Sequence, residues 1–502
     1  MDRKIGTRGI AESMNRAFLS WVLAPLLLLS GCAGSTMFTA YPRRIAPYLA
    51  AVSAGNPVDT GKALRSEVKG GNGTLYRMER GRLSMIQGDI AASRSDFEKA
   101  IDSIRAGDDR AVLSAGTAGS EVASWLLNDN ARRYEPDGYE RVLLHHFQAL
   151  DYLFAGDLEG AGVEVRLANA EQEEAARRHA ADIDTAERAA NENRVGTGRI
   201  RGLESGFSGM DDAAARVRNS FQNAYTFYLS GVVYEAMGQP NDAYIDYRKA
   251  LEIFPTNRTL QLDALRLAES LGMQDDSDEM RFRFRIPEGA TFRSGDPDSG
   301  DLVVFYEDGF VPPKEEVKFP VPLPGGGIGA IAFPIYRYDW APPAPLFVAR
   351  PNVVTWSTEP IAYIDAMAVS ALKEKIPGIV IRHLIRTGGK ALAAKAAGRS
   401  GRDAAAVAEL AVDLWNILSE NADLRSWVSL PRDAQVLRIQ LPAGRHVLAL
   451  RRGDEASEKV EVEIRRGGIT LLHVAGTGSV KHVKTAVLGG NASAPVAVEP
   501  VR

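Results

Sequence analysis

Small and aromatic residues recur at fixed spacing between Asn223 and Pro255, and this pattern constrains the fold more than any other feature. Counted from the first glycine, the positions stand at offsets 0, 3, 7, 12, 16, 19 and 24: Gly231, Tyr234, Gly238, Ala243, Tyr247, Ala250 and Pro255. Small residues let two antiparallel helices approach, an aromatic ring fills the groove between them, and proline cannot continue the second helix. The pattern therefore predicts a helical hairpin.

Two weaker copies precede this one, and each matches the first six offsets. Their residues are Gly81, Ser84, Gly88, Ser93, Phe97 and Ala100 in the first copy, and Ala149, Tyr152, Gly156, Ala161, Val165 and Ala168 in the second. In all three copies a glycine is followed by Asp or Gln, as expected where one helix ends and the next begins. The pattern closely resembles the tetratricopeptide repeat (TPR), a scaffold whose function resides on its concave face.

Other helices are expected around these copies. We predict helices near 109–127 and 260–271, the latter closing the array, and an extension of the middle copy to about residue 191. A glycine-rich segment, 194–209, interrupts the array.

From Met280 onwards the hydrophobic period changes from 3.6 to 2, and 281–286 alternates basic and apolar residues as a half-buried strand does. Further strands are expected at 302–307, 316–319, 330–336, 353–355, 435–441, 446–451, 459–465, 469–474 and 480–487. Between them, 361–421 reads as up to three helices, 361–375, 378–397 and 402–420. The piece 441–446 resembles, over six residues only, the turn of small β-sandwich modules of the PEGA kind.

The sequence thus predicts an α+β multidomain protein, with a TPR-like helical solenoid followed by a β-rich domain with a helical insert. The predicted limits are 64–275 for the solenoid, 276–484 for the β-rich domain with its insert at about 361–421, and 485–502 for a flexible tail.

The N-terminus carries an export signal. A basic lead precedes an almost wholly apolar run, 18–29, and then Leu29-Ser30-Gly31-Cys32, whose cysteine is the only one in the 502 residues. The stretch resembles the processing site of a bacterial lipoprotein, which predicts a signal peptide at 1–31, lipidation (palmitate-type acyl chains) at Cys32 and a tether at 32–63. An ordinary signal peptide ending near a cysteine is the alternative. The residues after Cys32 are Ala and Gly rather than Asp, which in this class favours the outer membrane.

Charge excludes one large class of partner. Removing residues 1–31 takes four basic and two acidic residues from the 60 and 64 of the chain, which leaves 56 and 62, a net charge of −6. A mildly acidic protein has no general electrostatic attraction to nucleic acid.

The order of these features resembles a family of TPR-bearing envelope lipoproteins of Gram-negative bacteria whose biochemical role is not established. Four parts of the sequence carry the resemblance: 75–89, 124–135 together with 140–161, 302–312 and 423–431. The resemblance implies an envelope location and assigns no catalytic residue.

Few residues suggest chemistry. His145-His146 invites a metal site, but neighbours on a helix point about 100° apart, so one is expected to face the core and one solvent, and no HExxH spacing is present. His446 and His473 lie in predicted strands without carboxylates at hydrogen-bonding positions in the sequence. Gly325-Gly326-Gly327 lacks the strand–turn–helix context of a dinucleotide loop. We therefore expect no cofactor, no metal and no enzyme.

One charge pattern is unusual. Between residues 375 and 402 there are seven cations and no acid: Lys375, Arg382, Arg386, Lys390, Lys395, Arg399 and Arg402. A basic amphipathic helix can lie on anionic lipid or on an acidic partner. The alternative, which we favour, is a helix that packs its apolar side onto the sheet.

The leading hypothesis is a non-catalytic, lipid-anchored scaffold at the outer membrane that faces the periplasm and binds another envelope protein through its TPR groove. One alternative is a module for cell-wall glycan or exported polysaccharide that uses Trp340, Trp356 or Trp427. Another is an unrecognised hydrolase, which requires acid and base side chains that converge in a cleft.

Overall fold

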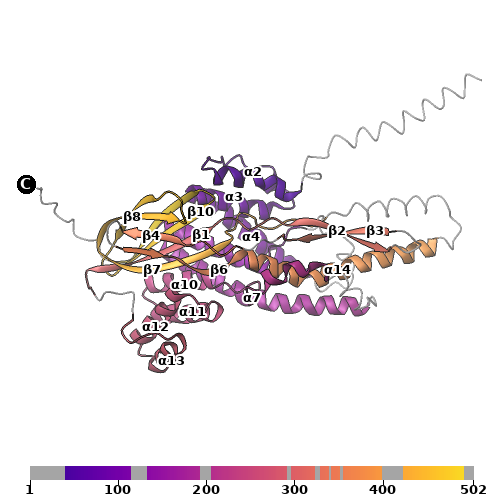
Figure 1. Ribbon diagram of the computed structural model, residues 1–502. Coiled ribbons are helices and arrows are strands. Elements are labelled where there is room, and N and C mark those ends of the chain that lie inside the picture. Colours follow the sequence, from indigo (N-terminus) through magenta and orange to yellow (C-terminus); the bar gives the residue numbers. More distant parts are fainter. Residues whose placement is uncertain are drawn as a thin grey trace, which may run out of the picture. The chain divides into compact units, whose positions relative to one another are not determined.

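The structure, a computed structural model, describes residues 40–114, 133–192, 205–290, 296–322, 328–337, 341–350, 354–397 and 422–490. The chain forms two compact units, Met1–Pro47 and Tyr48–Arg502. Cys32 and the predicted helix 402–420 lie outside the described residues, and the helix predicted at 109–127 is described only to Ser114. All contacts below lie within Tyr48–Arg502, which holds helices first and a β-rich region after them, as predicted (Figure 1). In the described part of the chain, no helix is long and apolar enough to span a membrane.

The N-terminal region is helical. Its helices are α2 (Tyr41–Ser53), α3 (Gly73–Gln87), α4 (Ile90–Ser114), α6 (Gly138–Phe154), α7 (Leu158–Glu192), α9 (Asp211–Ala214), α10 (Ala224–Ala236), α11 (Pro240–Ile253), α12 (Arg258–Ser270) and α13 (Gln274–Phe284), with 3₁₀ turns at Glu67–Lys69 and Ser205–Met210. The pairs α3–α4, α6–α7 and α10–α11 are the three predicted repeats, and α12–α13 follows them.

Packing explains why the repeat positions carry small residues. A methyl group at Gly81 would stand 2.6 Å from the Phe97 ring, and one at Gly231 would stand 2.3 Å from the Tyr247 ring, so only glycine lets these helices approach. At the turns, Gly88, Gly156 and Gly238 have φ of 90°, 77° and 71°, in the left-handed region that glycine adopts without strain.

The strand predicted at 281–286 is wrong. Residues 281–284 form the end of α13, and Arg285 caps the helix in the left-handed conformation with φ of 51°. Alternation over six residues is weak evidence, and the charges suit a helix better: Asp275 and Asp276 lie in its first turn, and Arg281 and Arg283 in its last. The predicted closing helix, α12, is therefore followed by one more helix.

The β-rich region contains eleven strands within the described ranges. They are β1 (Ser299–Asp308), β2 (Glu315–Pro322), β3 (Ile328–Ile335), β4 (Leu346–Arg350), β5 (Val354–Ser357), β6 (Glu359–Tyr363), β7 (Asp433–Pro442), β8 (Gly444–Arg452), β9 (Glu458–Ile464), β10 (Ile469–Thr477) and β11 (Val480–Leu488). The order β11-β10-β1-β7-β6 makes a five-stranded central sheet, β5-β4-β8-β9 a four-stranded sheet, and β2-β3 a hairpin.

Sequence reasoning missed β4 and β6 and divided one helix. The stretch 361–397 was predicted as two helices, but β6 occupies its start and α14 (Ile364–Ala397) runs unbroken through Pro377 and through Gly388-Gly389. The predicted tail, 485–502, begins inside β11, which ends at Leu488.

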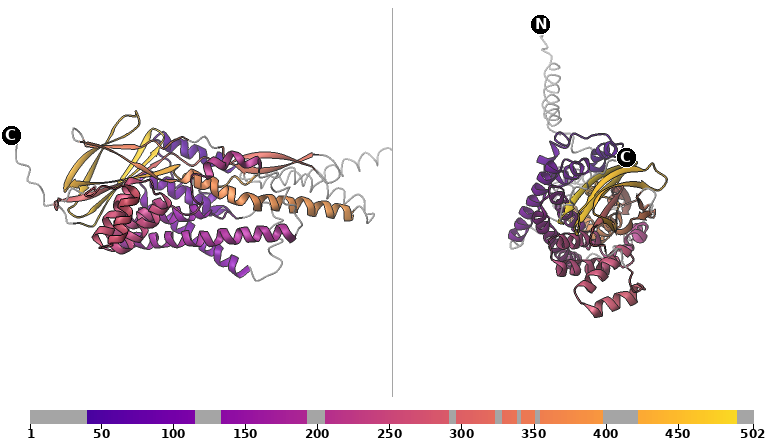
Figure 2. Two further views of the ribbon diagram at one scale, coloured as in Figure 1. Left: turned by 60° about the horizontal axis from the view of Figure 1, so that its bottom comes forward. Right: turned by 90° about the vertical axis from the view of Figure 1, so that its left-hand side faces the viewer.

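The two larger sheets pack face to face. Leu302 and Val304 of β1, Leu437 of β7 and Leu472 of β10 meet Leu450 of β8 in one apolar core. The opposite face of the central sheet lies against the helices, so β1 is buried along its whole length. In the right-hand view of Figure 2 the helices, indigo to pink, curve round the yellow strands.

Candidate functional site: the concave face of the helical array

The concave face of a TPR array is formed by the first helix of each pair, here α3, α6, α10 and α12. Side chains of these four helices contact the central sheet, β1, β7 and β10, and the segment that leads into β7. The face on which a partner was predicted to bind is therefore occupied by the chain itself.

A buried ion pair joins α3 to the sheet. Arg82 of α3 and Glu307 of β1 form a salt bridge, and their side chains are 2% and 1% exposed. The hydroxyl of Tyr225, on α10, donates to the same carboxylate at 2.8 Å, and Nε2 of His473, on β10, lies 3.1 Å from it. Although burial opposes ionisation, Arg82 and His473 hold the pKa of Glu307 well below its usual range. Glu307 is therefore a carboxylate whose charge is balanced by Arg82.

The two histidines of this cluster are held neutral. Burial lowers the pKa of His146 to about 3, and neither of its ring nitrogens has a hydrogen-bond partner among the described residues. Its ring lies against Tyr225, with centroids 4.2 Å apart. Burial also lowers the pKa of His473, although Glu307 acts in the opposite direction.

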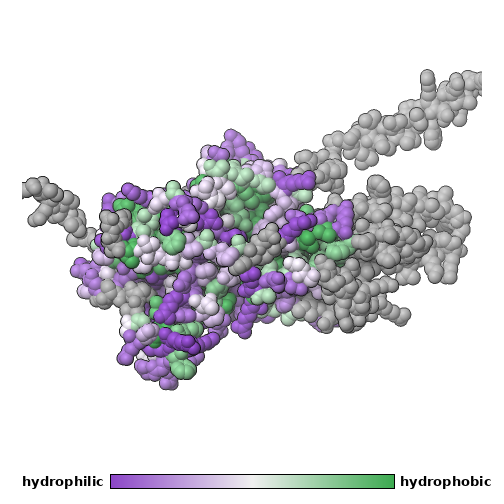
Figure 3. Space-filling model, in the orientation of Figure 1, coloured by the Kyte–Doolittle hydropathy of each residue, from purple (hydrophilic) through white to green (hydrophobic). Residues whose placement is uncertain are grey.

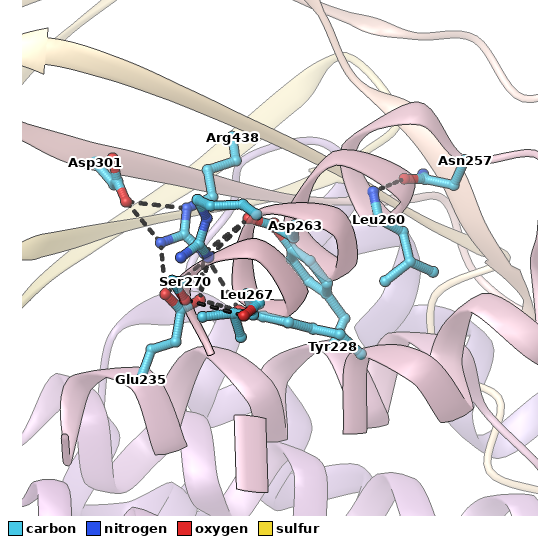
Figure 4. Close-up of polar contacts among 11 residues, drawn as sticks. Tyr228, Glu235, Asn257, Leu260, Asp263, Leu267, Ser270, Asp301 and Arg438 are labelled. Atoms are coloured by element: carbon cyan, nitrogen blue, oxygen red, sulfur yellow. Dashed lines mark hydrogen bonds and ion pairs between the residues drawn. The ribbon is translucent and has the colours of Figure 1, made fainter. Parts of the chain in front are cut away.

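A second cluster joins α10 and α12 to the sheet (Figure 4). The guanidinium of Arg438, on β7, is fully buried and meets Glu235 and Asp301 at 2.6 Å each and Asp263 at 3.2 Å. Arg266 of α12 pairs with the two carboxylates that come from helices, Glu235 at 2.8 Å and Asp263 at 3.0 Å. Despite burial, the two arginines lower the pKa of Glu235 to about 2.

The segment 422–432, which belongs to no helix or strand and turns at 428–430, lies in the array as a peptide ligand would. The fully buried indole of Trp427 packs edge-on against Phe97 and Phe147, with centroids 6.0 and 5.8 Å away. Glu140 accepts the backbone N–H of Trp427 at 2.7 Å, and Glu79 accepts those of the next two residues at 2.9 and 3.2 Å. Carboxylates from the concave face of the array thus bind the backbone of 427–429, while aromatic rings pack against the Trp427 side chain.

The chemistry of these clusters is that of a fixed interface. Acid and base groups converge on Glu307, as the hydrolase alternative requires, but Arg82, Glu307, Tyr225 and His473 are each at most 2% exposed, so a substrate does not reach them. Among the described residues, no group of three or more His, Cys, Asp and Glu side chains is placed to hold a metal ion.

The other residues singled out by sequence have structural surroundings where they are described. Both members of the pair His145-His146 are buried, so the expectation that one faces solvent is wrong, and Nδ1 of His145 lies 2.6 Å from Glu164. The fully buried Trp427 cannot stack on a glycan, which contradicts its role in the glycan alternative.

Several predicted features are only partly described. Trp356 packs partly buried against the apolar core between the sheets, while Trp340 and Gly325-Gly326-Gly327 lie outside the described residues. In the basic stretch, Lys375 pairs with Asp137 of the helical array, and the side chains from Arg382 onwards are outside the described set.

Sequence reasoning did not single out Arg82, Glu307 or Arg438, and it named His473 without its partner Glu307. Their sequence signal is a charged or histidine side chain inside an otherwise apolar strand: Glu307 after LVVFY, Arg438 in VLRIQL and His473 in TLLHVA. Buried strands seldom carry such groups unless a partner satisfies them.

Comparison with known proteins supports the third of the three repeats. The tetratricopeptide repeat family matches residues 224–257, which are α10, the turn and α11. The chain contains a tetratricopeptide repeat. No curated protein and no solved structure matches it. TPR repeats generally mediate protein–protein contact. In this chain the concave face of the repeats contacts the chain's own central sheet.

Proposed function

We propose that the protein is a non-catalytic scaffold of the Gram-negative cell envelope, lipid-anchored through Cys32 to the outer membrane, facing the periplasm and binding another envelope protein. The TPR repeat supports a role in protein–protein contact. The pattern of a signal sequence at 1–31 and the cysteine that follows it support the anchor and the location.

The filled concave face determines which surface of the scaffold is left to bind a partner. A peptide that entered the groove from outside would displace Trp427 and separate Arg82 from Glu307 and Arg438 from its two helix carboxylates, Glu235 and Asp263. Separating one buried charge from its partner costs about 3–5 kcal/mol. We therefore revise the groove hypothesis: the array and the sheet form one rigid body, and the partner binds an outer surface.

The anchor is tested by metabolic labelling with radioactive palmitate in a Gram-negative host, followed by separation of the two membranes. We expect label in the wild-type protein, none in Cys32→Ala, and sedimentation of the labelled protein with the outer membrane. Unlabelled wild-type protein, or label at the inner membrane only, would contradict this part of the proposal.

The partner is tested by photo-crosslinking in cells, followed by mass spectrometry. The photoreactive residue replaces one of three half-exposed side chains, Val163 on α7, Ile245 on α11 or Val447 on β8. We expect a discrete set of envelope proteins at one position and fewer at the others, with loss of that set in Cys32→Ala. Recovery of wall fragments alone, or of no protein at any position, would overturn the scaffold.

A further inference from the structure

The last helix of the array, α13, presents an aromatic side chain to solvent. Phe282 is 89% exposed, whereas the next most exposed large hydrophobic side chain among the described residues, Ile245, is 50% exposed. In a solenoid, the face beyond the last helix is where a further repeat would stack, and soluble arrays cover it with a polar face. An exposed phenyl ring at this position is unfavourable unless something covers it.

The charges around this ring are divided by sign. Asp275, Asp278, Glu279 and Phe282 lie at i, i+3, i+4 and i+7, so they share one side of the helix, and all four are exposed. Beyond the ring stand two exposed arginines, Arg283 and Arg285. The helix dipole accounts for acids at the start and bases at the end, but it does not account for the phenyl ring between them.

A hollow of about 40 Å³ lies between α11 and α13, next to the side of α13 that carries Glu279. Leu251, Met280 and Phe284 contribute its apolar lining, and the exposed Glu279 and Arg283 also line it. In Figure 3 the surface at the α12–α13 end, at the bottom of the view, is largely purple with small green areas, so apolar groups here are isolated among charges.

We propose that this face of α13 binds the same face of a second copy of the chain, with the two helices antiparallel. In that arrangement the acids of one copy meet the arginines of the other, and the two Phe282 rings pack together near a twofold axis. The surface is complementary to itself because its acidic half and its basic end exchange places under that rotation. A helix from an unrelated protein would need the same inverted order of charges by coincidence.

The association is measured by sedimentation velocity on the purified Cys32→Ala chain over about 1 to 100 µM. We expect a concentration-dependent monomer–dimer equilibrium. Phe282→Ser should raise the dissociation constant at least about tenfold, because a central aromatic anchor dominates small interfaces. Ile245→Ser, on α11, is the matched control and should leave the constant unchanged.

A charge exchange tests the orientation. Asp278→Lys with Glu279→Lys, and separately Arg283→Glu with Arg285→Glu, should each abolish self-association, while an equimolar mixture of the two variants should form a heterodimer. A chain that stays monomeric throughout the range, a dimer that survives Phe282→Ser, or a mixture that stays monomeric would overturn the proposal.

Discussion

The central sheet buries both of its faces, and the two faces differ in chemistry. Along β1, Leu302, Val304 and Tyr306 point into the apolar core shared with the second sheet, whereas Phe305 and Glu307 point towards the helices. The same alternation gives one interface made almost entirely of hydrocarbon and another that contains fully buried ion pairs.

This difference indicates how each contact is specified. Apolar packing is non-directional and tolerates exchange of one side chain for another of similar volume. A buried charge stabilises only the arrangement that supplies its partners and penalises every other. We infer that the sandwich provides stability, while the charged face selects the single way in which the sheet sits in the array.

The largest effect is expected from Arg438→Leu. The substitution removes the guanidinium that Glu235, Asp263 and Asp301 share while the three carboxylates stay buried, and removal of one partner from such a cluster costs about 3–5 kcal/mol. Urea unfolding measures the loss. Arg438→Lys keeps the charge but cannot reach all three carboxylates, so it should also destabilise. A loss below about 1 kcal/mol for both variants would show that the charged face does not hold the sheet.

A smaller loss, about 3 kcal/mol, is expected from Leu472→Ala on the apolar face, because a fully buried side chain is replaced by a cavity. The sharper comparison is with Leu472→Ile, which conserves volume and should cost less than about 1.5 kcal/mol. If the conservative exchange is as damaging here as Arg438→Lys is on the other face, the two faces do not differ in tolerance.

The sequence predicted the helices and strands better than the contact between the helical array and the central sheet. Gly231 and Tyr247 revealed the helix pairs because that packing is local, within sixteen residues, and β7 to β11 followed from alternation. Arg82 and Glu307 are separated by 225 residues, and Glu79 and Val428 by 349, so no spacing along the chain reports these pairs. Only the lone charges inside apolar strands indicated that a buried partner exists. They did not indicate which one.

The charged face should also make stability depend on pH. His146 has a folded pKa of about 3, and the unfolded value is about 6.5, so between these values the unfolded chain binds more protons. Stability attributable to His146 is therefore complete above pH 6.5 and falls as the pH is lowered, by up to about 1.4 kcal/mol per unit. In His146→Phe the free energy of unfolding should fall less steeply as the pH is lowered. Urea unfolding from pH 7.5 to 4.5 measures this dependence.

Asp151 serves as a control, because its contribution to stability should change with pH in the opposite direction to that of His146. Burial raises its pKa to about 7, so between about 4 and 7 the folded chain binds the extra proton and its contribution to stability falls as the pH rises. The advantage of Asp151→Asn over the wild type should therefore grow with pH across that window. Parallel curves for wild type and both variants would contradict the assignment of these two groups.

The smallest effect is expected at a salt bridge outside both interfaces. Arg445 and Glu461 pair across β8 and β9 at 3.5 Å, with 80% and 60% of their side chains exposed. Water and salt screen such a pair, so Arg445→Ala should change the free energy of unfolding by less than about 0.5 kcal/mol. Arg445 on β8 lies seven residues after Arg438 on β7, and each arginine pairs with a carboxylate. The two pairs differ in burial. A comparable loss at both would mean that the charge pairing itself, rather than its burial against the helices, determines the cost, and the contrast between the two faces would have to be abandoned.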